Sequence, residues 1–137
     1  RKFSGEALAD VPEPIDLLYI DGAHRFGPAL DDIVAWGARV VPGGTMLIHD
    51  SFNALGVTLA QAAVLFTSGE FRYVGRSESM AEYRRERLGP LRRITNLGRQ
   101  VGQLPYFAWC QLVKVLITLK LGALTRLIGN PSGEWPY

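Results

Sequence analysis

Two short, mainly apolar runs, each followed at once by acidic or histidine residues, constrain the fold of this chain most strongly. The first run covers residues 15–20 and precedes Asp21; the second covers residues 45–48 and precedes His49 and Asp50. Runs of this length without regular polar alternation predict strands buried on both faces, as in parallel sheets. Because a helix-length segment separates them, the two strands are predicted to form a parallel crossover unit.

The segments around these runs complete an α/β pattern. Apolar residues at helical spacing predict helices over residues 28–40 and 57–67, and the Pro-Gly-Gly sequence at 42–44 is expected to end the first. Residues 71–75 and 79–83 predict two strands joined by a turn. The order strand, helix, strand, helix, strand, strand predicts an α/β sheet with parallel crossovers and a terminal antiparallel pair.

Charge divides the chain into two parts. Residues 1–83 carry six Lys/Arg and eleven Asp/Glu, a net charge of −5, whereas residues 84–137 carry nine and two, a net charge of +7. This asymmetry indicates segments with different roles. We expect residues 1–87 to form half of an α/β domain and residues 88–137 to form a basic, amphipathic helical segment.

Cysteine content and the first residues limit the class of protein. The chain of 137 residues has one cysteine, Cys110, which excludes a disulfide framework and a multi-cysteine zinc site. It begins with Arg1 and shows no signal-peptide pattern. We therefore expect a cytoplasmic protein, peripheral to a membrane if attached to one, and a sequence taken from a longer chain.

The residues after the two runs are the candidate site. Ligands of open α/β sheets bind beyond the carboxyl ends of the strands, so Asp21 and Asp50 are expected at one sheet edge, within reach of one hard cation such as Mg²⁺. His24, on the loop after Asp21, is a candidate general base. In the alternative, Asp21 caps a turn, Asp50 caps the next helix and His24 is a solvent-facing loop residue. His49 is interpreted as structural, because strand alternation points it away from Asp50.

Several motifs fall in order along the chain: Ile20-Asp21-Gly22-Ala23-His24, Asp31-Asp32, Trp36, Val41-Pro42-Gly43-Gly44 and Ile48-His49-Asp50. Over about residues 14–85 the chain resembles the C-terminal half of class I S-adenosylmethionine-dependent methyltransferases. The resembled branch includes macrocin-type sugar O-methyltransferases and is related to cephalosporin-hydroxylase-like proteins. The resemblance implies a Rossmann-like sheet in which the strand at 79–83 is antiparallel and inserted between those at 45–48 and 71–75.

The resemblance also implies roles for individual residues. Asp21 and Asp50 would be metal ligands, His24 the catalytic base, and S-adenosylmethionine (SAM) the cofactor. Many metal-dependent members carry an acid or Asn directly after the second Asp. Here that position is Ser51, and Ser51 or Asn53 could contribute an oxygen.

The cofactor loop of that family has no counterpart in this chain. No Gly-x-Gly-x-x-Gly pattern occurs, and Gly43-Gly44 lies between a predicted helix and a strand, which is the wrong context. We therefore assign no cofactor-binding residue, expect the N-terminal half of the domain to be absent, and expect this chain alone to be inactive.

The basic end of the chain predicts a membrane or protein contact. Six arginines fall within residues 84–99, and a mostly apolar stretch follows at 106–128. Three cations within or beside the apolar positions argue against a transmembrane span, whereas a wide apolar face with aromatic residues at one end suits a helix lying in a membrane interface. The alternative is packing on the absent half or in a homo-oligomer. No nucleic-acid-binding fold is visible around the arginines.

Two functions from different classes remain. The first is an O-methyltransferase that acts on a small-molecule, sugar or glycolipid hydroxyl with a metal that orients and acidifies it. The second is a non-catalytic, membrane-peripheral or assembly module on a degenerate methyltransferase scaffold. A Rossmann oxidoreductase is unsupported, because the dinucleotide-binding loop is missing.

Overall fold

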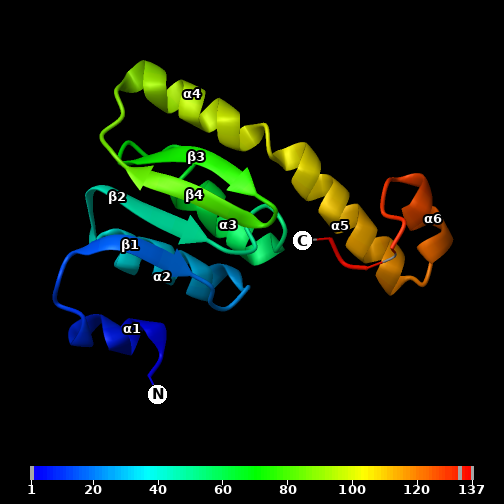
Figure 1. Ribbon diagram of the computed structural model, residues 1–137, viewed down its shortest axis with the longest axis horizontal. Coiled ribbons are helices and arrows are strands. Elements are labelled where there is room, and N and C mark those ends of the chain that lie inside the picture. Colours follow the sequence, from blue (N-terminus) through cyan, green and yellow to red (C-terminus); the bar gives the residue numbers. More distant parts are fainter. Residues whose placement is uncertain (1, 133, 137) are drawn as a thin grey trace.

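A computed structural model describes residues 2–132 and 134–136. Within these residues a single four-stranded sheet has the order β1-β2-β4-β3, and helices flank it (Figure 1). The strands are β1 (Ile15–Ile20), β2 (Val40–Ile48), β3 (Phe71–Ser77) and β4 (Met80–Arg85). The helices are α1 (Ser4–Ala7), a 3-10 turn at Leu8–Asp10, α2 (Phe26–Gly37), α3 (Leu55–Val64), α4 (Pro90–Val101), α5 (Leu104–Thr118) and α6 (Gly122–Leu127). The expected α/β class is confirmed, and the sheet is consistent with a Rossmann-like methyltransferase fold.

The sheet combines one parallel and two antiparallel pairings. β1 and β2 are parallel, with Ile20 opposite Ile48, so both strands end at the same edge of the sheet. β4 lies between β2 and β3 and is antiparallel to both. The predicted insertion of the last strand is therefore confirmed.

β2 begins earlier than the sequence predicts. It starts at Val40, not at Thr45, and the Pro-Gly-Gly sequence at 42–44 lies inside it. The pairing with β1 is irregular there, because Ile15 is opposite Val40 whereas Leu17 is opposite Thr45. Gly43, with φ +83°, supplies the left-handed conformation that this bulge requires.

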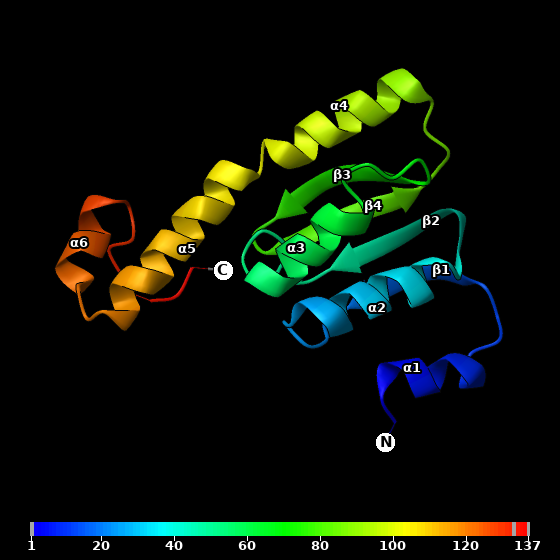
Figure 2. The ribbon, with the colours of Figure 1, turned by 180° about the vertical axis from the view of Figure 1, so that it is seen from behind.

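Helices α2 and α3 pack on each other and on the same face of the sheet, which Figure 2 shows from the helix side. The buried core lies between this helix layer and the strands. Its largest fully buried apolar side chains are Tyr73, Tyr83, Phe52, Met46 and Ile48. The rings of Tyr73 and Tyr83 lie 5.5 Å apart, which ties β3 to β4.

Helix α4 runs along β3 and is bound to it by polar side chains. Asn96 accepts a hydrogen bond from the Tyr73 N–H at 2.7 Å and donates one to the Phe71 carbonyl at 3.1 Å. Gln100 accepts a hydrogen bond from the Tyr83 hydroxyl at 3.1 Å. The two bonds of Asn96 satisfy backbone groups of β3 that would otherwise form an open sheet edge, and the bond of Gln100 links α4 to the side chain of Tyr83 in β4.

The apolar stretch at 106–128, which the sequence presents as one helical segment, is divided between α5 and α6. Lys120 has φ +59°, and the Leu121 N–H donates to the Leu116 carbonyl at 2.8 Å. This arrangement is a Schellman-type helix stop. In residues 2–132 and 134–136, every helix falls short of the length and apolar character that a bilayer crossing requires.

Candidate active site

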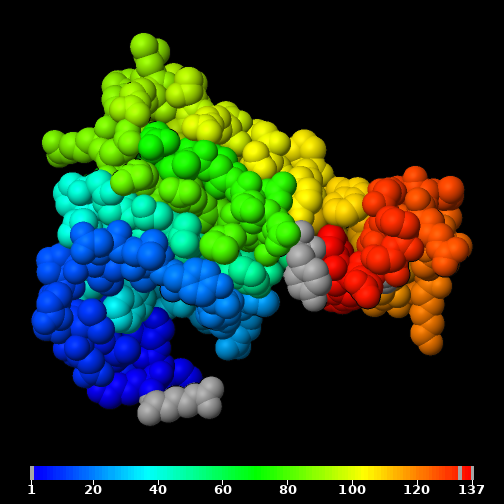
Figure 3. Space-filling view, in the orientation of Figure 1, coloured from blue at the N-terminus to red at the C-terminus, as the bar shows by residue number. Residues whose placement is uncertain are grey.

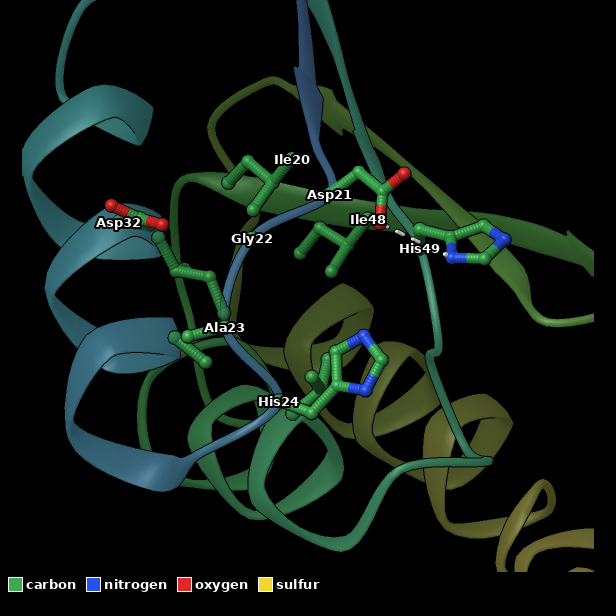
Figure 4. Close-up of a pocket in the computed structure, with 11 residues that line it drawn as sticks. Ile20, Asp21, Gly22, Ala23, His24, Asp32, Ile48 and His49 are labelled. Atoms are coloured by element: carbon green, nitrogen blue, oxygen red, sulfur yellow. Dashed lines mark ion pairs between the residues drawn. The ribbon is translucent and has the colours of Figure 1, made fainter. Parts of the chain in front are cut away.

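Asp21, His24 and Asp50 converge beyond the carboxyl ends of β1 and β2. One potential ligand atom from each residue lies within 4.8 Å of those of the other two. His24 Nε2 lies 2.7 Å from Asp50 Oδ2. The expected proximity of the two carboxylates is confirmed, and Figure 4 shows Asp21 and the His24 ring on the same side of the loop that follows β1.

His49 joins this cluster, which corrects the sequence interpretation. Its Nδ1 lies 3.2 Å from Asp50 Oδ2 and 3.5 Å from Asp21 Oδ1 (Figure 4, dashed line to Asp21). Strand alternation does not apply here, because β2 ends at Ile48 and Asp50 has a left-handed φ of +55°. The turn brings His49 and Asp50 to the same side.

The turn after β2 separates the two candidates for a further oxygen ligand. Ser51 is fully buried; its Oγ donates to the Ile48 carbonyl at 2.7 Å and accepts from Gln61 Nε2 at 2.6 Å. It therefore points into the core, and of the two residues left open as a source of a further oxygen, Ser51 does not face the site. Asn53 is buried beside the cluster, its Nδ2 lies 3.5 Å from Asp50 Oδ1, and no described residue hydrogen-bonds to its Oδ1.

The alternative capping role of Asp50 is also wrong. The residue that precedes α3 is Ala54, and no side chain caps this helix. Asp21, in turn, accepts a hydrogen bond from the Tyr19 hydroxyl at 3.2 Å. Partial desolvation, this bond, and the negative charges of Asp21 and Asp50 raise the pKa of Tyr19. Tyr19 therefore stays protonated and available as a donor to Asp21.

A cleft of about 450 Å³ opens beside the cluster. Besides the two acids, both histidines and Asn53, it is lined by Ala54, Lys114, Trp135 and Pro136. Lys114 of α5 donates to the Asn53 carbonyl at 2.9 Å and lies 5.3 Å from the centre of the Trp135 ring. Desolvation lowers the pKa of Lys114, and the nearby Cys110 and Asp50 oppose this shift. The sequence does not predict that Lys114 and Trp135 line the cleft, because this arrangement depends on packing between segments that are distant in the sequence.

The donor atoms of the cluster fit a divalent cation. Ligands of one ion at about 2.0–2.6 Å lie within about 5 Å of each other, and the three donor atoms meet this limit. Two carboxylates favour a hard cation such as Mg²⁺ or Mn²⁺, and a histidine nitrogen is acceptable to Mn²⁺. Asp21 and Asp50 are the residues that would hold the ion.

Comparison with known proteins gives one family match. A family model described as a methyltransferase domain matches residues 1–51, a segment that runs through β1, α2 and β2 and includes the three clustered residues. The match supports a methyltransferase domain. SAM is the usual cofactor of such a domain. No curated protein matches the chain.

Proposed function

We propose that this chain carries the acceptor-activating part of a SAM-dependent O-methyltransferase that acts on a sugar or glycolipid hydroxyl with the assistance of a divalent cation. The observation that carries the proposal is the convergence of Asp21, His24 and Asp50 at the ends of parallel strands, within the segment that matches a methyltransferase domain. Ligand sites of open α/β sheets occupy this edge.

His24 is suited to act as the general base. Its Nε2 lies 2.7 Å from the Asp50 carboxylate, which can accept a hydrogen bond from Nε2–H. This bond fixes the tautomer in which Nε2 carries the proton. Nδ1 is then left to accept a proton from an acceptor hydroxyl in the cleft. The second contact of Asp50, with His49, holds the carboxylate in place.

The cation would sit between Asp21 and Asp50 and would supply electrostatic stabilisation of the acceptor oxygen as it loses its proton. Beside the cluster, the buried Oδ1 of Asn53 accepts no hydrogen bond from a described residue, and Asn53 Nδ2 lies 3.5 Å from Asp50 Oδ1. Tyr19 orients Asp21 by a hydrogen bond. This chain therefore offers both the ligands and the groups that position them.

The cleft has the composition of a sugar site. The Trp135 ring offers an apolar face, while Lys114, Asn53 and the acids offer polar groups around it. Sugar rings stack their C–H faces on aromatic rings and direct their hydroxyls to polar side chains. The volume of about 450 Å³ lies within the range of small-molecule sites.

The residues of this chain do not fit the methionine part of SAM, because the sequence has no glycine-rich loop after a strand. Among the described residues, no strand pairs with the outer edge of β1. We propose that strands outside this sequence pair with that edge and bring the cofactor loop.

Methyl transfer by a protein that includes those strands tests the proposal. Replacing His24 by Ala should lower kcat by roughly 10²–10⁴-fold with saturating metal and SAM. Asp31→Asn, an exposed carboxylate on α2, serves as the control and should keep full activity. A rate for the His24 variant within about threefold of wild type would remove His24 from the mechanism.

The exposed apolar side chains of α4, α5 and α6 favour the second candidate, a non-catalytic, membrane-peripheral or assembly module. In that case the chain should not bind Mn²⁺ through Asp21 and Asp50, and no sugar acceptor should be methylated. Isothermal titration of the chain with Mn²⁺ separates the two functions. A heat of Mn²⁺ binding that is lost in Asp21→Asn and kept in Asp31→Asn supports the metal-assisted methyltransferase. The absence of such a heat supports the non-catalytic module.

A further inference from the structure

We propose that α4 and α5 dock on the surface of an anionic lipid bilayer. The contact is an exposed apolar stripe along both helices, called the docking stripe below. It consists of Leu91, Ile94 and Val101 on α4, Leu104, Leu112 and Val115 on α5, and Leu119 directly after α5. This interaction is independent of the proposed methyl transfer, because it needs neither a metal nor SAM.

The docking stripe on α4 lies away from the sheet. Leu91 is 79% exposed and Ile94 is 67% exposed, whereas Asn96 and Gln100 are buried against β3 and β4. At 3.6 residues per turn, Leu91, Ile94 and Val101 fall on one side of the helix. A helix that is already bound to the sheet by its polar residues thus presents its apolar side to the outside.

Helix α5 continues the same arrangement. Leu104, Leu112, Val115 and Leu119 are spaced so that they share one side of the helix, and all four are exposed. Cys110 and Val113 are buried on the side that packs on the protein. Figures 1 and 3 show α4 and α5 following one another along the molecule, with α5 and α6 projecting beyond the sheet. The stripe can therefore reach a flat surface.

Charge identifies the partner. Residues 87–133 contain seven Lys/Arg and no Asp or Glu. Arg93 and Arg99 donate to the backbone carbonyls of Leu88 and Val74, and no carboxylate of a described residue pairs with either. These bonds hold both arginines on the sheet side of α4. Arg87 precedes α4 and Lys120 directly follows Leu119; both are exposed, and neither forms an ion pair with a described carboxylate. An apolar stripe with cations near its two ends matches an anionic bilayer, where acyl chains bury the leucines and headgroups meet the cations.

Other partners fit this surface less well. A second copy of the chain would bring two acid-free, cationic surfaces together, and like charges oppose that contact. Nucleic acid would pair with the arginines but would leave the leucines in water. Because no helix of the described residues is long and apolar enough to cross a bilayer, the contact is with its surface.

Co-sedimentation of the full 137-residue chain with lipid vesicles tests the proposal. With vesicles of phosphatidylcholine containing about 30% phosphatidylserine, the bound fraction should exceed that with phosphatidylcholine alone by at least about tenfold at physiological salt. Raising the salt to about 1 M should release most of the protein, because it shortens the screening length to about 3 Å. Equal sedimentation with both kinds of vesicle would overturn the proposal.

A pair of variants tests the residues. Leu91→Gln with Ile94→Gln should lower binding to anionic vesicles by about tenfold or more, since it removes two of the most exposed leucine-type side chains of the stripe. Leu55→Gln with Leu59→Gln, on α3, removes side chains that are 56% and 48% exposed and should leave binding unchanged. Far-UV circular dichroism and urea unfolding establish that both variants fold.

Sedimentation velocity without lipid gives the competing outcome. If the chain forms a dimer that Leu91→Gln with Ile94→Gln dissociates, then a second copy covers the docking stripe and the membrane proposal is wrong. A monomer that binds anionic vesicles supports it, whether or not methyl transfer is found.

Discussion

Asp50 combines a backbone requirement with a chemical one. It adopts a left-handed conformation, with φ +55°, directly after β2. Asp and Asn tolerate this region better than other residues that carry a side chain. The same turn directs the Asp50 carboxylate toward both histidines. A residue at this position must therefore permit the turn and, in the proposed metal site, would also supply an oxygen ligand.

Two substitutions of Asp50 separate these requirements. Asp50→Asn should keep the free energy of unfolding within about 1 kcal/mol of wild type, because Asn also tolerates the left-handed region, but it should weaken Mn²⁺ binding at least about tenfold. Asp50→Ala should lose the same affinity and about 1 kcal/mol more stability. Urea unfolding and calorimetric titration with Mn²⁺ provide the measurements. Unchanged Mn²⁺ affinity in Asp50→Asn would mean that Asp50 is not a ligand.

Gly56, the second residue of α3, sets the position of the His24 loop. A Cβ at this position would lie 2.2 Å from the His24 carbonyl oxygen and 2.7 Å from the Phe26 nitrogen. Both are backbone atoms, so Gly56→Ala should move the loop and cost about 1–3 kcal/mol of unfolding free energy, measured in urea. Gly98→Ala, in α4, has open space around it and should stabilise by about 0.5–1 kcal/mol. Destabilisation of equal size in both variants would exclude the close contact as the cause.

The positions of Asp21 and Asp50 could be predicted from the sequence, because neighbouring parallel strands fix where their first following residues lie. The position of His49 in the cluster could not be predicted, because it depends on a left-handed turn at Asp50 that no local sequence signal marks. Lys114 and Trp135 reach the cleft only through the packing of α5 and the chain end. Such long-range contacts leave no pattern in a single sequence.

Elements were predictable where hydrophobic patterning decides them. The strand order follows from parallel crossovers and a final antiparallel pair, whereas the early start of β2 depends on a bulge at Gly43. The break between α5 and α6 uses Lys120 where glycine is usual, so the sequence gives no stop signal. In α4, Asn96 and Gln100 are buried although polar, because they complete backbone hydrogen bonds and side-chain contacts of the sheet.

Glu86 links the sheet to α4 and should make this link sensitive to acid. Its carboxylate pairs with Arg72 of β3 at 2.8 Å and also with Arg92 of α4. The hydrogen bond from Arg72, followed by the charges of Arg72 and Arg92, lowers the pKa of Glu86 below its ordinary value of 4.5. The carboxylate therefore stabilises the folded state above pH 4.5, and this contribution is lost as the pH falls through the folded-state pKa.

Replacing Glu86 by Gln tests this link. The variant should be less stable than wild type by about 0.5–1 kcal/mol at neutral pH, a modest value because the pair is partly exposed. The difference should shrink toward zero in acid, as the pH falls through the lowered folded-state pKa of Glu86. Urea unfolding at neutral and acidic pH measures it. A difference that stays constant between neutral and acidic pH would show that the ion pairs do not contribute through the Glu86 charge.

At the scale of the whole molecule, the acidic part of the chain (residues 1–83) and the basic part (residues 84–137) meet at the candidate site. Gln111 and Lys114 of α5 both donate to the carbonyl of Asn53, at 2.7 and 2.9 Å, in the turn that carries Asp50. Helix α5 thus lines the cleft through Lys114 and also contains part of the docking stripe. A bilayer-bound α5 would hold the cleft close to the headgroups, where the sugar of a glycolipid lies.

Metal binding and cofactor binding should be separable in this chain. Asp21 and Asp50, the proposed ligands of the cation, already lie close together in the structure. The contacts that SAM needs include a glycine-rich loop, and the sequence has none. Calorimetric titration of the 137-residue chain should therefore show binding of Mn²⁺ and no measurable binding of SAM, with or without Mn²⁺. If SAM bound at micromolar concentrations, its site would have to be built from the residues around β1 and β2 alone, and no further strands on the β1 edge would be needed to complete the site.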